Sequence, residues 1–370
     1  MGDNQINFQT IPMHGNRRSV GCDETREKIL NNMVIVGGPY RGGTTILTDF
    51  INSHEEICVA SDFLEREHTS IFYFAGQTGL CAYVKNPELS QYTARGIIAN
   101  GVFDGEHIVG LTKILGNGFK NERFTYRGDK RFVINDLGRY TLPIEQFHQR
   151  HRLAMKHPEV AYCFPRLAGV LNKAKILLTY RPMQYVVRSW VRATTSKPGT
   201  WADLFDVWLD DEGKKALPVH VPHDLKDAWQ DYNVFQRIVC FNNELYKAFL
   251  NGVRTLDRDR FLLLHHQNLV EHPDLHRKAI CSFIGISDRS RSMFEFQKKF
   301  LRNRNKEISF TDEQNAQAKE VLGMSLKETQ EAFEEEFVKE LTIVPRKLAT
   351  TAPKEPPKAM VTPMLFQQSA

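Results

Sequence analysis

The chain has 370 residues, of which 41% are hydrophobic and 25% charged, and its net charge is +5. This composition is ordinary for a folded globular protein and excludes a largely disordered chain. No apolar run reaches the roughly eighteen residues that a membrane-spanning helix needs, and the polar N-terminus lacks the apolar core of a secretory signal. We therefore expect a cytoplasmic protein without stable membrane insertion.

The charge is unevenly placed along the chain. Residues 306–340 carry ten acidic and four basic residues, so the rest of the chain is near +11. A basic body suits an anionic ligand, whereas the absence of lysine runs with interleaved aromatic residues argues against nucleic acid. The six cysteines form no C-x-x-C pair, which favours reduced thiols over disulfides or a structural zinc site.

The first half of the chain opens with a polar arm, predicted for residues 1–30, and continues with a strand and a helix. The apolar run 33–38 (MVIVGG) predicts a buried strand. In the following stretch, 44–54, four apolar side chains fall on one helical face: Ile46, Leu47, Phe50 and Ile51. Residues 60–160 mix glycines with aromatic residues, and we interpret them as loops and short helices around a substrate cleft.

The second half alternates strands and helices. The run 175–181 (KILLTYR) predicts a buried strand, with a helix after Pro182; the run 261–266 (FLLLHH) predicts another, with a helix over 273–284. Residues 313–341 predict one amphipathic helix with an acidic outer face. The expected architecture is a single P-loop-type α/β domain over residues 31–344, with a central, mostly parallel sheet covered by helices. A C-terminal amphipathic helix and a disordered tail over 345–370 complete it.

The segment GPYRGGTT (38–45) lies between the first strand and the first helix. In that context a glycine-rich loop predicts phosphate binding, because glycines let backbone N–H groups surround an oxyanion at a helix N-terminus. We expect Thr44 and Thr45 to donate hydroxyl hydrogen bonds and to cap the helix. A Walker A loop has Lys where this chain has Thr44, so the loop is poorly suited to ATP-driven phosphoryl transfer.

The loop resembles that of the sulfotransferase family, which reads approximately G-x-x-R-S-G-T-T. Matching residues are Gly38, Arg41, Gly43, Thr44 and Thr45. Gly42 replaces the usual Ser, so a backbone role alone is carried over for it. The resemblance covers residues 31–290 and implies 3′-phosphoadenosine 5′-phosphosulfate (PAPS) as the sulfuryl donor, with 3′-phosphoadenosine 5′-phosphate (PAP) as product and no metal.

A second element of that family binds the donor's 3′-phosphate with an Arg at a strand end and a Ser eight residues later. Arg181 and Ser189 have this spacing. Arg supplies a fixed charge in fork geometry and Ser a rotatable donor. The resemblance therefore implies that Arg41, Gly42, Gly43, Thr44, Thr45, Arg181 and Ser189 bind PAPS, with Arg41 also stabilising the leaving phosphate during in-line displacement.

The acceptor hydroxyl needs a general base. Alignment with the family favours Asp62, and three neighbouring side chains stay open as alternatives: Glu65, Glu67 and His68. The family's K-x-P element falls on Cys163-Phe164-Pro165, where the Lys is missing; Lys113 and Lys156 are candidate substitutes. The family's acidic E-D-L sequence is replaced by Gln267-Asn268-Leu269.

The acceptor class is open, with a carbohydrate or a small molecule as candidates. A basic cluster could meet an acidic glycan: Arg123, Arg127, Lys130 and Arg131. The nearest metal-ligand candidates, His148-x-x-His151 and His265-His266, are interpreted as surface or packing histidines. Two other functions stay open, a P-loop nucleotide or small-molecule kinase and a non-catalytic P-loop binding module. The oligomeric state is not predicted.

Overall fold

The structure is a computed structural model of the chain. The residues that it describes are 20–60, 103–104, 107–111, 133–134, 140–145, 147, 151–156, 169–196, 208–209, 215–216, 221–301 and 308–342. Several predicted site residues lie outside this set: Asp62, Glu65, Glu67, His68, Lys113, Arg123, Arg127, Lys130, Arg131 and His148. The predicted C-terminal tail lies outside it as well.

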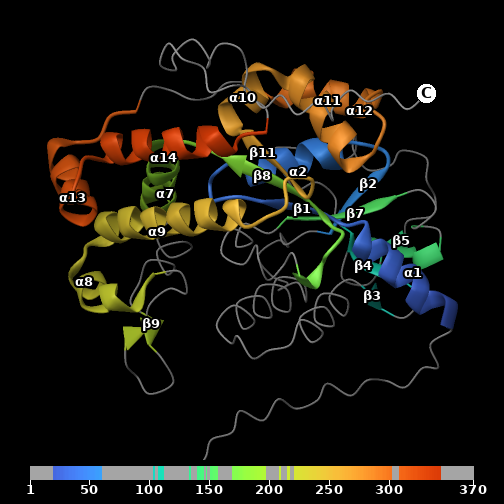
Figure 1. Cartoon of the computed structure of the whole chain (residues 1–370), viewed down its shortest axis with the longest axis horizontal. Coiled ribbons are helices and arrows are strands. Elements are labelled where there is room, and N and C mark those ends of the chain that lie inside the picture. The colour runs from blue at the N-terminus through green and yellow to red at the C-terminus, as the bar shows by residue number, and fades with distance from the viewer. Residues whose placement is uncertain are drawn as a thin grey trace, which may run out of the picture.

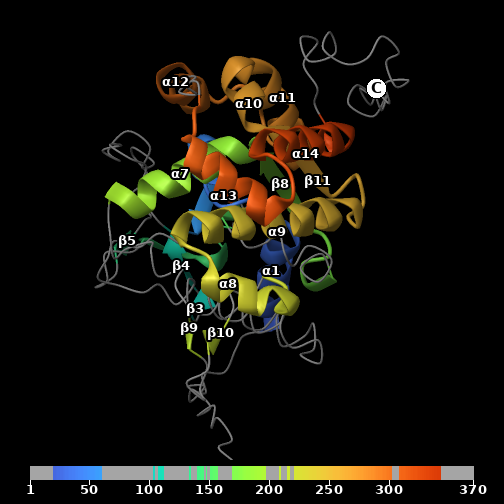
Figure 2. The same ribbon diagram turned by 90° about the vertical axis from the view of Figure 1, so that its left-hand side faces the viewer.

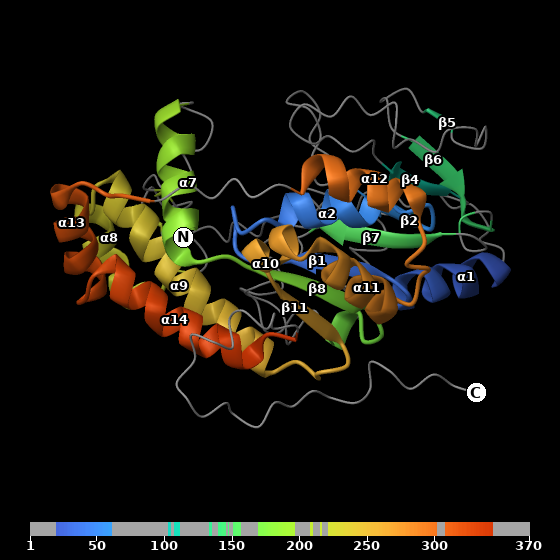
Figure 3. The ribbon, with the colours of Figure 1, turned by 90° about the horizontal axis from the view of Figure 1, so that it is seen from above.

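A sheet forms the centre of the described part of the chain, in the order β11-β8-β1-β7-β2-β4-β6-β5. Its first five strands are parallel, as predicted: β11 Phe261–His265, β8 Lys175–Tyr180, β1 Val34–Gly37, β7 Arg152–Lys156 and β2 Ile57–Ala60. β1 lies between β8 and β7, with Val36 opposite both Leu177 and Lys156. Figure 3 shows these strands side by side.

An antiparallel extension continues the sheet beyond β2. It consists of β4 His107–Leu111, β6 Tyr140–Pro143 and β5 Val133–Ile134, and β3 Phe103–Asp104 pairs with β4. Loops and short helices were predicted over 60–160, which is wrong for these strands and for β7. Each has at most five residues, too few to establish a hydrophobic period.

Helices cover both faces of the sheet. One face packs against α2 Thr44–Asn52, α11 Pro273–Ile284 and α12 Arg291–Phe300, and the other against α9 Val234–Arg254 with its neighbours. Figures 1 and 2 show α11 and α12 on one side of the strands and α9 on the other. Alternate residues of each strand enter the two cores, Ile35 and Leu178 on the α9 side and Val36 and Leu177 on the α2 side.

The long helices after the buried strands were predicted well. α2 buries Leu47, Phe50 and Ile51, while Ile46 is half-buried. α7 Met183–Ser196 begins just after Pro182, and α11 has the predicted bounds with Pro273 in its first turn. A six-residue helix, α10 His266–Glu271, connects β11 to α11.

The C-terminal amphipathic segment is two helices rather than the single helix predicted. α13 Asp312–Leu322 ends at Gly323, which adopts a left-handed φ of 73°, and α14 Leu326–Glu340 begins after Ser325. Capping boxes start both helices, Thr311 with Gln314 and Ser325 with Glu328. The glycine and the second cap interrupt the helix that the apolar spacing alone predicts.

The N-terminal prediction also needs correction. Residues Val20–Asn31 form a helix, α1, within the region assigned to a polar arm. Its last turn buries Ile29 and Leu30 in the core that α9 also covers. Two apolar residues at the end of a polar segment are enough to anchor this helix, although they form no repeating pattern.

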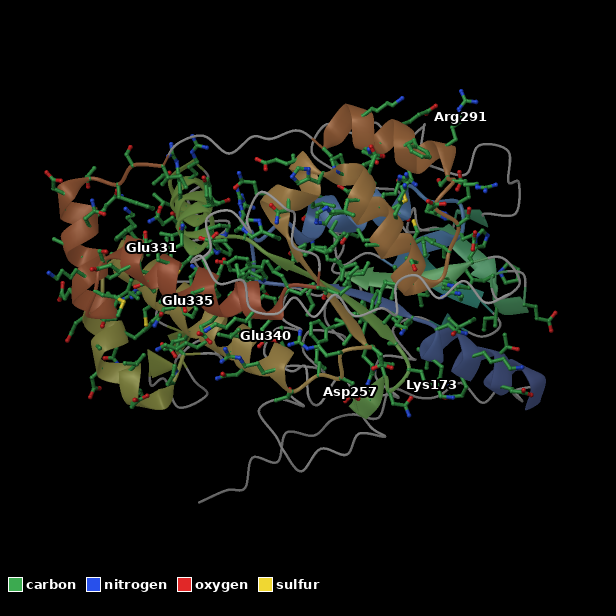
Figure 4. All side chains as sticks on the ribbon, turned by 45° about the horizontal axis from the view of Figure 1, so that its top comes forward. Lys173, Asp257, Arg291, Glu331, Glu335 and Glu340 are labelled. Atoms are coloured by element: carbon green, nitrogen blue, oxygen red, sulfur yellow. The ribbon has the colours of Figure 1, made fainter. Side chains whose placement is uncertain are left out.

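α14 is tied to α9 by ion pairs, and the residues that follow it reach β11 at the edge of the parallel strands. Glu336 and Glu340 pair with Arg254, and Glu340 also pairs with Arg258, which ties α14 to the end of α9 and to the loop that follows it. Beyond the helix, the Thr342 N–H donates to the Leu263 carbonyl of β11 at 3.3 Å. Figure 4 shows Glu331 and Glu335 along α14, with Glu340 at its end.

α8 Lys226–Asp231 and a 3₁₀ turn, His223–Leu225, precede α9. A small hairpin pairs β9 Trp208–Leu209 with β10 Lys215–Ala216. In Figure 3 the chain passes from the end of β8 into α7, which lies toward the left of the view together with α13 and α14. The glycine loop after β1 and Arg181 after β8 lie at this end of the sheet.

Candidate functional site

The glycine loop lies where the chain changes direction across the sheet. After β1 the next parallel strands, β2 and β7, are placed on one side of it, whereas β8 and β11 are placed on the other. Loops leaving β1 and β8 therefore diverge, and the crevice between such strand ends is the usual ligand position in open α/β sheets. Gly38 follows β1 at this point and Arg181 follows β8.

The loop backbone contains three residues with positive φ. Gly38 has a φ of 139° and Gly43 of 100°, and Arg41 has a φ of 62°. Glycine adopts these angles readily, but a left-handed arginine is uncommon and costs conformational energy. Alternation of left- and right-handed residues turns successive N–H groups toward one side, the arrangement that binds anions.

Two glycines of the loop are required by close contacts. A Cβ atom on Gly38 would lie 2.5 Å from the Thr179 carbonyl oxygen of β8. A Cβ on Gly42 would lie 2.6 Å from the Pro39 carbonyl oxygen, which accepts the Gly42 N–H in a tight turn. The glycine loop thus packs directly against Thr179 of β8, next to Tyr180 and Arg181 in the sequence.

The first turn of α2 has no side-chain cap. Gly43 is its N-cap and no side chain caps the helix, so the expectation that Thr44 or Thr45 caps it is wrong. N–H groups in the first turn have no partner within a helix, and the helix dipole adds positive potential there. Thr45 is exposed beside these groups, while Thr44 is buried.

The loop and the second predicted element meet. Arg41 Nε donates to Ser189 Oγ at 2.9 Å, and Arg181 Nη1 donates to the Arg41 carbonyl oxygen at 3.1 Å. Arg41 is therefore a neighbour of Arg181 and Ser189, which follow it in the sequence by 140 and 148 residues. Their roles in binding a donor stay a prediction.

The two guanidinium groups create local positive potential. Desolvation lowers the pKa of Arg41, and among the described residues no carboxylate contacts its side chain. Desolvation also lowers the pKa of Arg181, and the charge of Arg41 lowers it further. Like charges held this close favour an anion between or beside them.

Aromatic residues of α7 and α9 hold the glycine loop and Arg181 in place. Tyr40 packs against Trp190 of α7 and Phe241 of α9, with ring centroids 6.1 and 6.4 Å apart. The Arg41 guanidinium lies over the Trp190 ring at 5.8 Å. The Tyr246 hydroxyl of α9 donates to the Arg181 carbonyl oxygen. The glycine loop and Arg181, just before α7, thus both contact α9.

Lys156 is one of the two candidate substitutes for the motif lysine, and the only one of them among the described residues. It ends β7, beside β1, and is only 5% exposed. In the sequence it begins Lys156-His157-Pro158, which is itself a K-x-P pattern. Whether Lys156 is the motif lysine stays a prediction, and Cys163-Phe164-Pro165 lies outside the described residues. The pattern could have been found from the sequence if RLAMK had been identified as a strand.

Asp49 is a buried carboxyl group on α2, 7% exposed, in the helix that follows the loop. Burial raises its pKa to about 7, and the Lys156 charge offsets part of that rise. A carboxyl group with a folded pKa above its unfolded value is destabilising when ionised. The loss of folding free energy caused by ionised Asp49 is absent below about pH 4 and grows as the pH rises from about 4 to about 7.

We expect Asp49→Asn to be more stable than wild type at pH 8, by roughly 2–4 kcal/mol, since each pKa unit corresponds to about 1.4 kcal/mol. Near pH 4 the two proteins should be equally stable. Urea denaturation at both pH values measures this difference. Asp257→Asn, at an exposed position (Figure 4), controls for loss of a surface charge. Lower stability of Asp49→Asn at pH 8 would contradict the expectation.

Of the pair His265-His266, interpreted from the sequence as surface or packing histidines, only His265 fits that interpretation fully. His265 is 3% exposed at the end of β11 and fits a packing role. His266 stands against the glycine loop, which the sequence did not indicate. Within the described ranges, no three metal-ligand side chains cluster as a metal ion would require. Nor does any helix in those ranges have the length and apolar character needed to cross a membrane.

Comparison with known proteins identifies the family. The model of the sulfotransferase family matches residues 33–290, and the chain belongs to this family. Among curated proteins, no sequence matches the chain at a significant level.

Solved structures similar to the chain include three sulfotransferases. The sulfotransferase domain from the curacin biosynthetic pathway is 13% identical with a TM-score of 0.40, covering 83% of this chain and 98% of its own. That of the Synechococcus olefin synthase is 14% identical with a TM-score of 0.39, covering 85% and 95%. A sulfotransferase from Mycobacterium avium is 9% identical with a TM-score of 0.41, covering 87% and 80%.

Proposed function

We propose that the protein is a PAPS-dependent sulfotransferase that moves a sulfuryl group to an acceptor hydroxyl. The observation that carries the proposal is the direct contact of Arg41 with Ser189 and of Arg181 with the Arg41 backbone. These contacts bring together the two elements that we propose to bind anions. PAPS carries phosphate groups at two positions, and a donor with one anion at each end matches this arrangement.

The residues present fit the donor. The N–H groups of Gly42 to Thr45 and the Arg41 side chain would hold the 5′-phosphosulfate. Arg181 and Ser189 would hold the 3′-phosphate, which distinguishes PAPS from ATP. A bound anion would also relieve the repulsion between the two guanidinium groups and give the uncapped first turn of α2 its missing partners.

Bound PAPS supplies the sulfuryl group that is transferred. Arg41 and the loop N–H groups would stabilise the negative charge that develops on the leaving phosphate, because they are fixed before the reaction begins. Lys156, at the end of the neighbouring strand, would add a positive charge at the same edge of the sheet. We propose Asp62 as the general base that takes the acceptor's proton, with Glu65, Glu67 and His68 as alternatives.

The kinase alternative is not favoured. ATP-dependent phosphoryl transfer in P-loop enzymes uses a lysine that reaches the β- and γ-phosphates, and this chain has Thr44 at that position. Arg41 lies earlier in the loop, bonded to Ser189. Its position suits a donor that is bound at two separate anionic groups.

Calorimetric titration of the protein with PAP, and separately with ATP and Mg²⁺, tests the proposal. We expect PAP to bind at least ~100-fold more tightly than ATP, as phosphate recognition by a dedicated Arg–Ser pair implies. Binding of ATP with Mg²⁺ but not of PAP would overturn the sulfotransferase proposal and support a kinase.

For the acceptor we propose a carbohydrate or small-molecule hydroxyl in the cytoplasm. The basic residues between 123 and 131 that suggest an acidic glycan lie outside the described residues. A panel of phenolic, sterol and glycan acceptors, assayed by transfer of ³⁵S from labelled PAPS, distinguishes these classes. Competition by sulfated or carboxylated glycans would favour the carbohydrate.

A further inference from the structure

His266 packs against the glycine loop at Gly43. It is the first residue of α10, directly after β11, and β11 is the strand paired with β8. A Cβ atom on Gly43 would lie 2.0 Å from His266 Cδ2 and 2.8 Å from Nε2. The imidazole therefore fills the space that a side chain at the N-cap of α2 would occupy.

The surroundings keep this imidazole neutral. Burial lowers the pKa of His266 to about 3, and the charge of Arg181 from β8 and of His265 from β11 act in the same direction. Acidic groups on the adjoining helices face His265 instead. Burial lowers the pKa of His265 to about 4, the Glu271 charge on α10 offsets part of that shift, and Glu334 on α14 lies 3.9 Å from its Nε2. The loop itself faces His266 with an uncharged glycine.

The two ring nitrogens of His266 have different environments. Nδ1 is buried and finds no hydrogen-bond partner among the described residues, whereas Nε2 lies on the edge that meets Gly43. A neutral imidazole carries its hydrogen on one nitrogen only. Placing that hydrogen on Nε2 leaves an N–H donor beside the uncapped first turn of α2, where the anion of the proposed donor would lie.

We propose that His266 is a binding residue of the donor site, and that its Nε2–H donates a hydrogen bond, as a neutral group, to the phosphate held by the glycine loop. This inference rests on the proposed function. Positive charge is already supplied by Arg41 and Arg181, and a third cation would add repulsion to the ligand-free site. A neutral imidazole donor adds a directional hydrogen bond that is unchanged from pH 5.5 to pH 8.

PAP titrations of wild type, His266→Ala and His266→Gln test the inference. Loss of a hydrogen bond to a charged group is expected to weaken PAP binding roughly tenfold in His266→Ala. Glutamine offers a neutral N–H donor and should bind PAP within about threefold of wild type. The matched control is His276→Gln, since His276 is a buried histidine of α11 whose Nδ1 bonds to the His272 carbonyl oxygen. Its PAP affinity should equal that of wild type, and thermal melting verifies that each variant is folded.

Repeating the titrations at pH 6.5 in two buffers of different ionisation enthalpy counts the protons exchanged on binding. A neutral donor predicts the same number for wild type and His266→Gln, because the ligand's own phosphate protonation is common to both. Proton uptake by wild type that His266→Gln lacks would overturn the inference and identify an imidazolium. Equal PAP affinity of wild type and His266→Ala would also overturn it while leaving the proposed function intact. Failure of wild type to bind PAP would overturn the proposed function itself.

Discussion

Replacing Arg181 with alanine is expected to weaken PAP binding about 100-fold, or about 2.7 kcal/mol, while leaving adenosine 5′-phosphate binding nearly unchanged. Arg181 directly follows β8 beside the loop, with its carbonyl fixed by the Tyr246 hydroxyl and its side chain donating to the Arg41 backbone. A fixed guanidinium binds phosphate with paired, charge-assisted hydrogen bonds. Calorimetry with the two nucleotides measures the contribution of the 3′-phosphate directly.

Two controls sharpen this comparison. Arg291→Ala removes the same charge from α12, where the side chain is 90% exposed (Figure 4), and should leave both affinities unchanged. Arg181→Lys keeps the charge but loses the fork geometry, so we expect an intermediate loss for PAP. Equal weakening of both nucleotides by Arg181→Ala would show that this residue does not distinguish the 3′-phosphate.

The second large effect is expected for Gly38→Ala. An added Cβ would lie 2.5 Å from the Thr179 carbonyl oxygen, and the φ of 139° is one that side chains rarely adopt. Backbone strain and overpacking each cost roughly 1–3 kcal/mol, so we expect a loss of about 3 kcal/mol in the free energy of unfolding. Because relief of the contact moves the loop away from β8, PAP binding should be lost as well.

Gly323→Ala is the matched control for this substitution. Gly323 also has a positive φ, at 73°, but a Cβ there would meet no atom within 4 Å. Strain alone should cost about 1 kcal/mol and leave PAP binding unchanged. Urea denaturation and PAP titration of the two variants separate backbone strain from the contact with β8. Equal effects on stability and binding would contradict the account of the loop.

The parts of the site that the sequence predicts are those encoded over short distances. The glycine loop is contiguous, and Arg181 and Ser189 follow one strand at helical spacing, so each could be found locally. That the two elements meet follows from strand order, because parallel strands bring their carboxyl ends to one edge. This topology is sufficient to predict that the loop carrying Arg41 lies near the helix carrying Ser189.

The residues that could not be placed from the sequence depend on tertiary neighbours. Lys156 was named only as one of two candidates, because the five-residue strand that it ends was assigned to loops. His266 was interpreted as a surface or packing residue because nothing near it in sequence indicates the approach to Gly43. The break between α13 and α14 was different, since Gly323 and the Ser325–Glu328 capping box are local features that apolar periodicity alone overlooks.

A crystal structure of the protein with PAP tests the central claim most directly, that one crevice binds both anionic groups of a sulfuryl donor. The account predicts the 5′-phosphate on the N–H groups of Gly42 to Thr45, and the 3′-phosphate on Arg181 and Ser189. It also predicts that Arg41 and Ser189 exchange their mutual hydrogen bond for bonds to the ligand. PAP bound away from the loop, or with its two phosphates in reversed positions, would contradict the account.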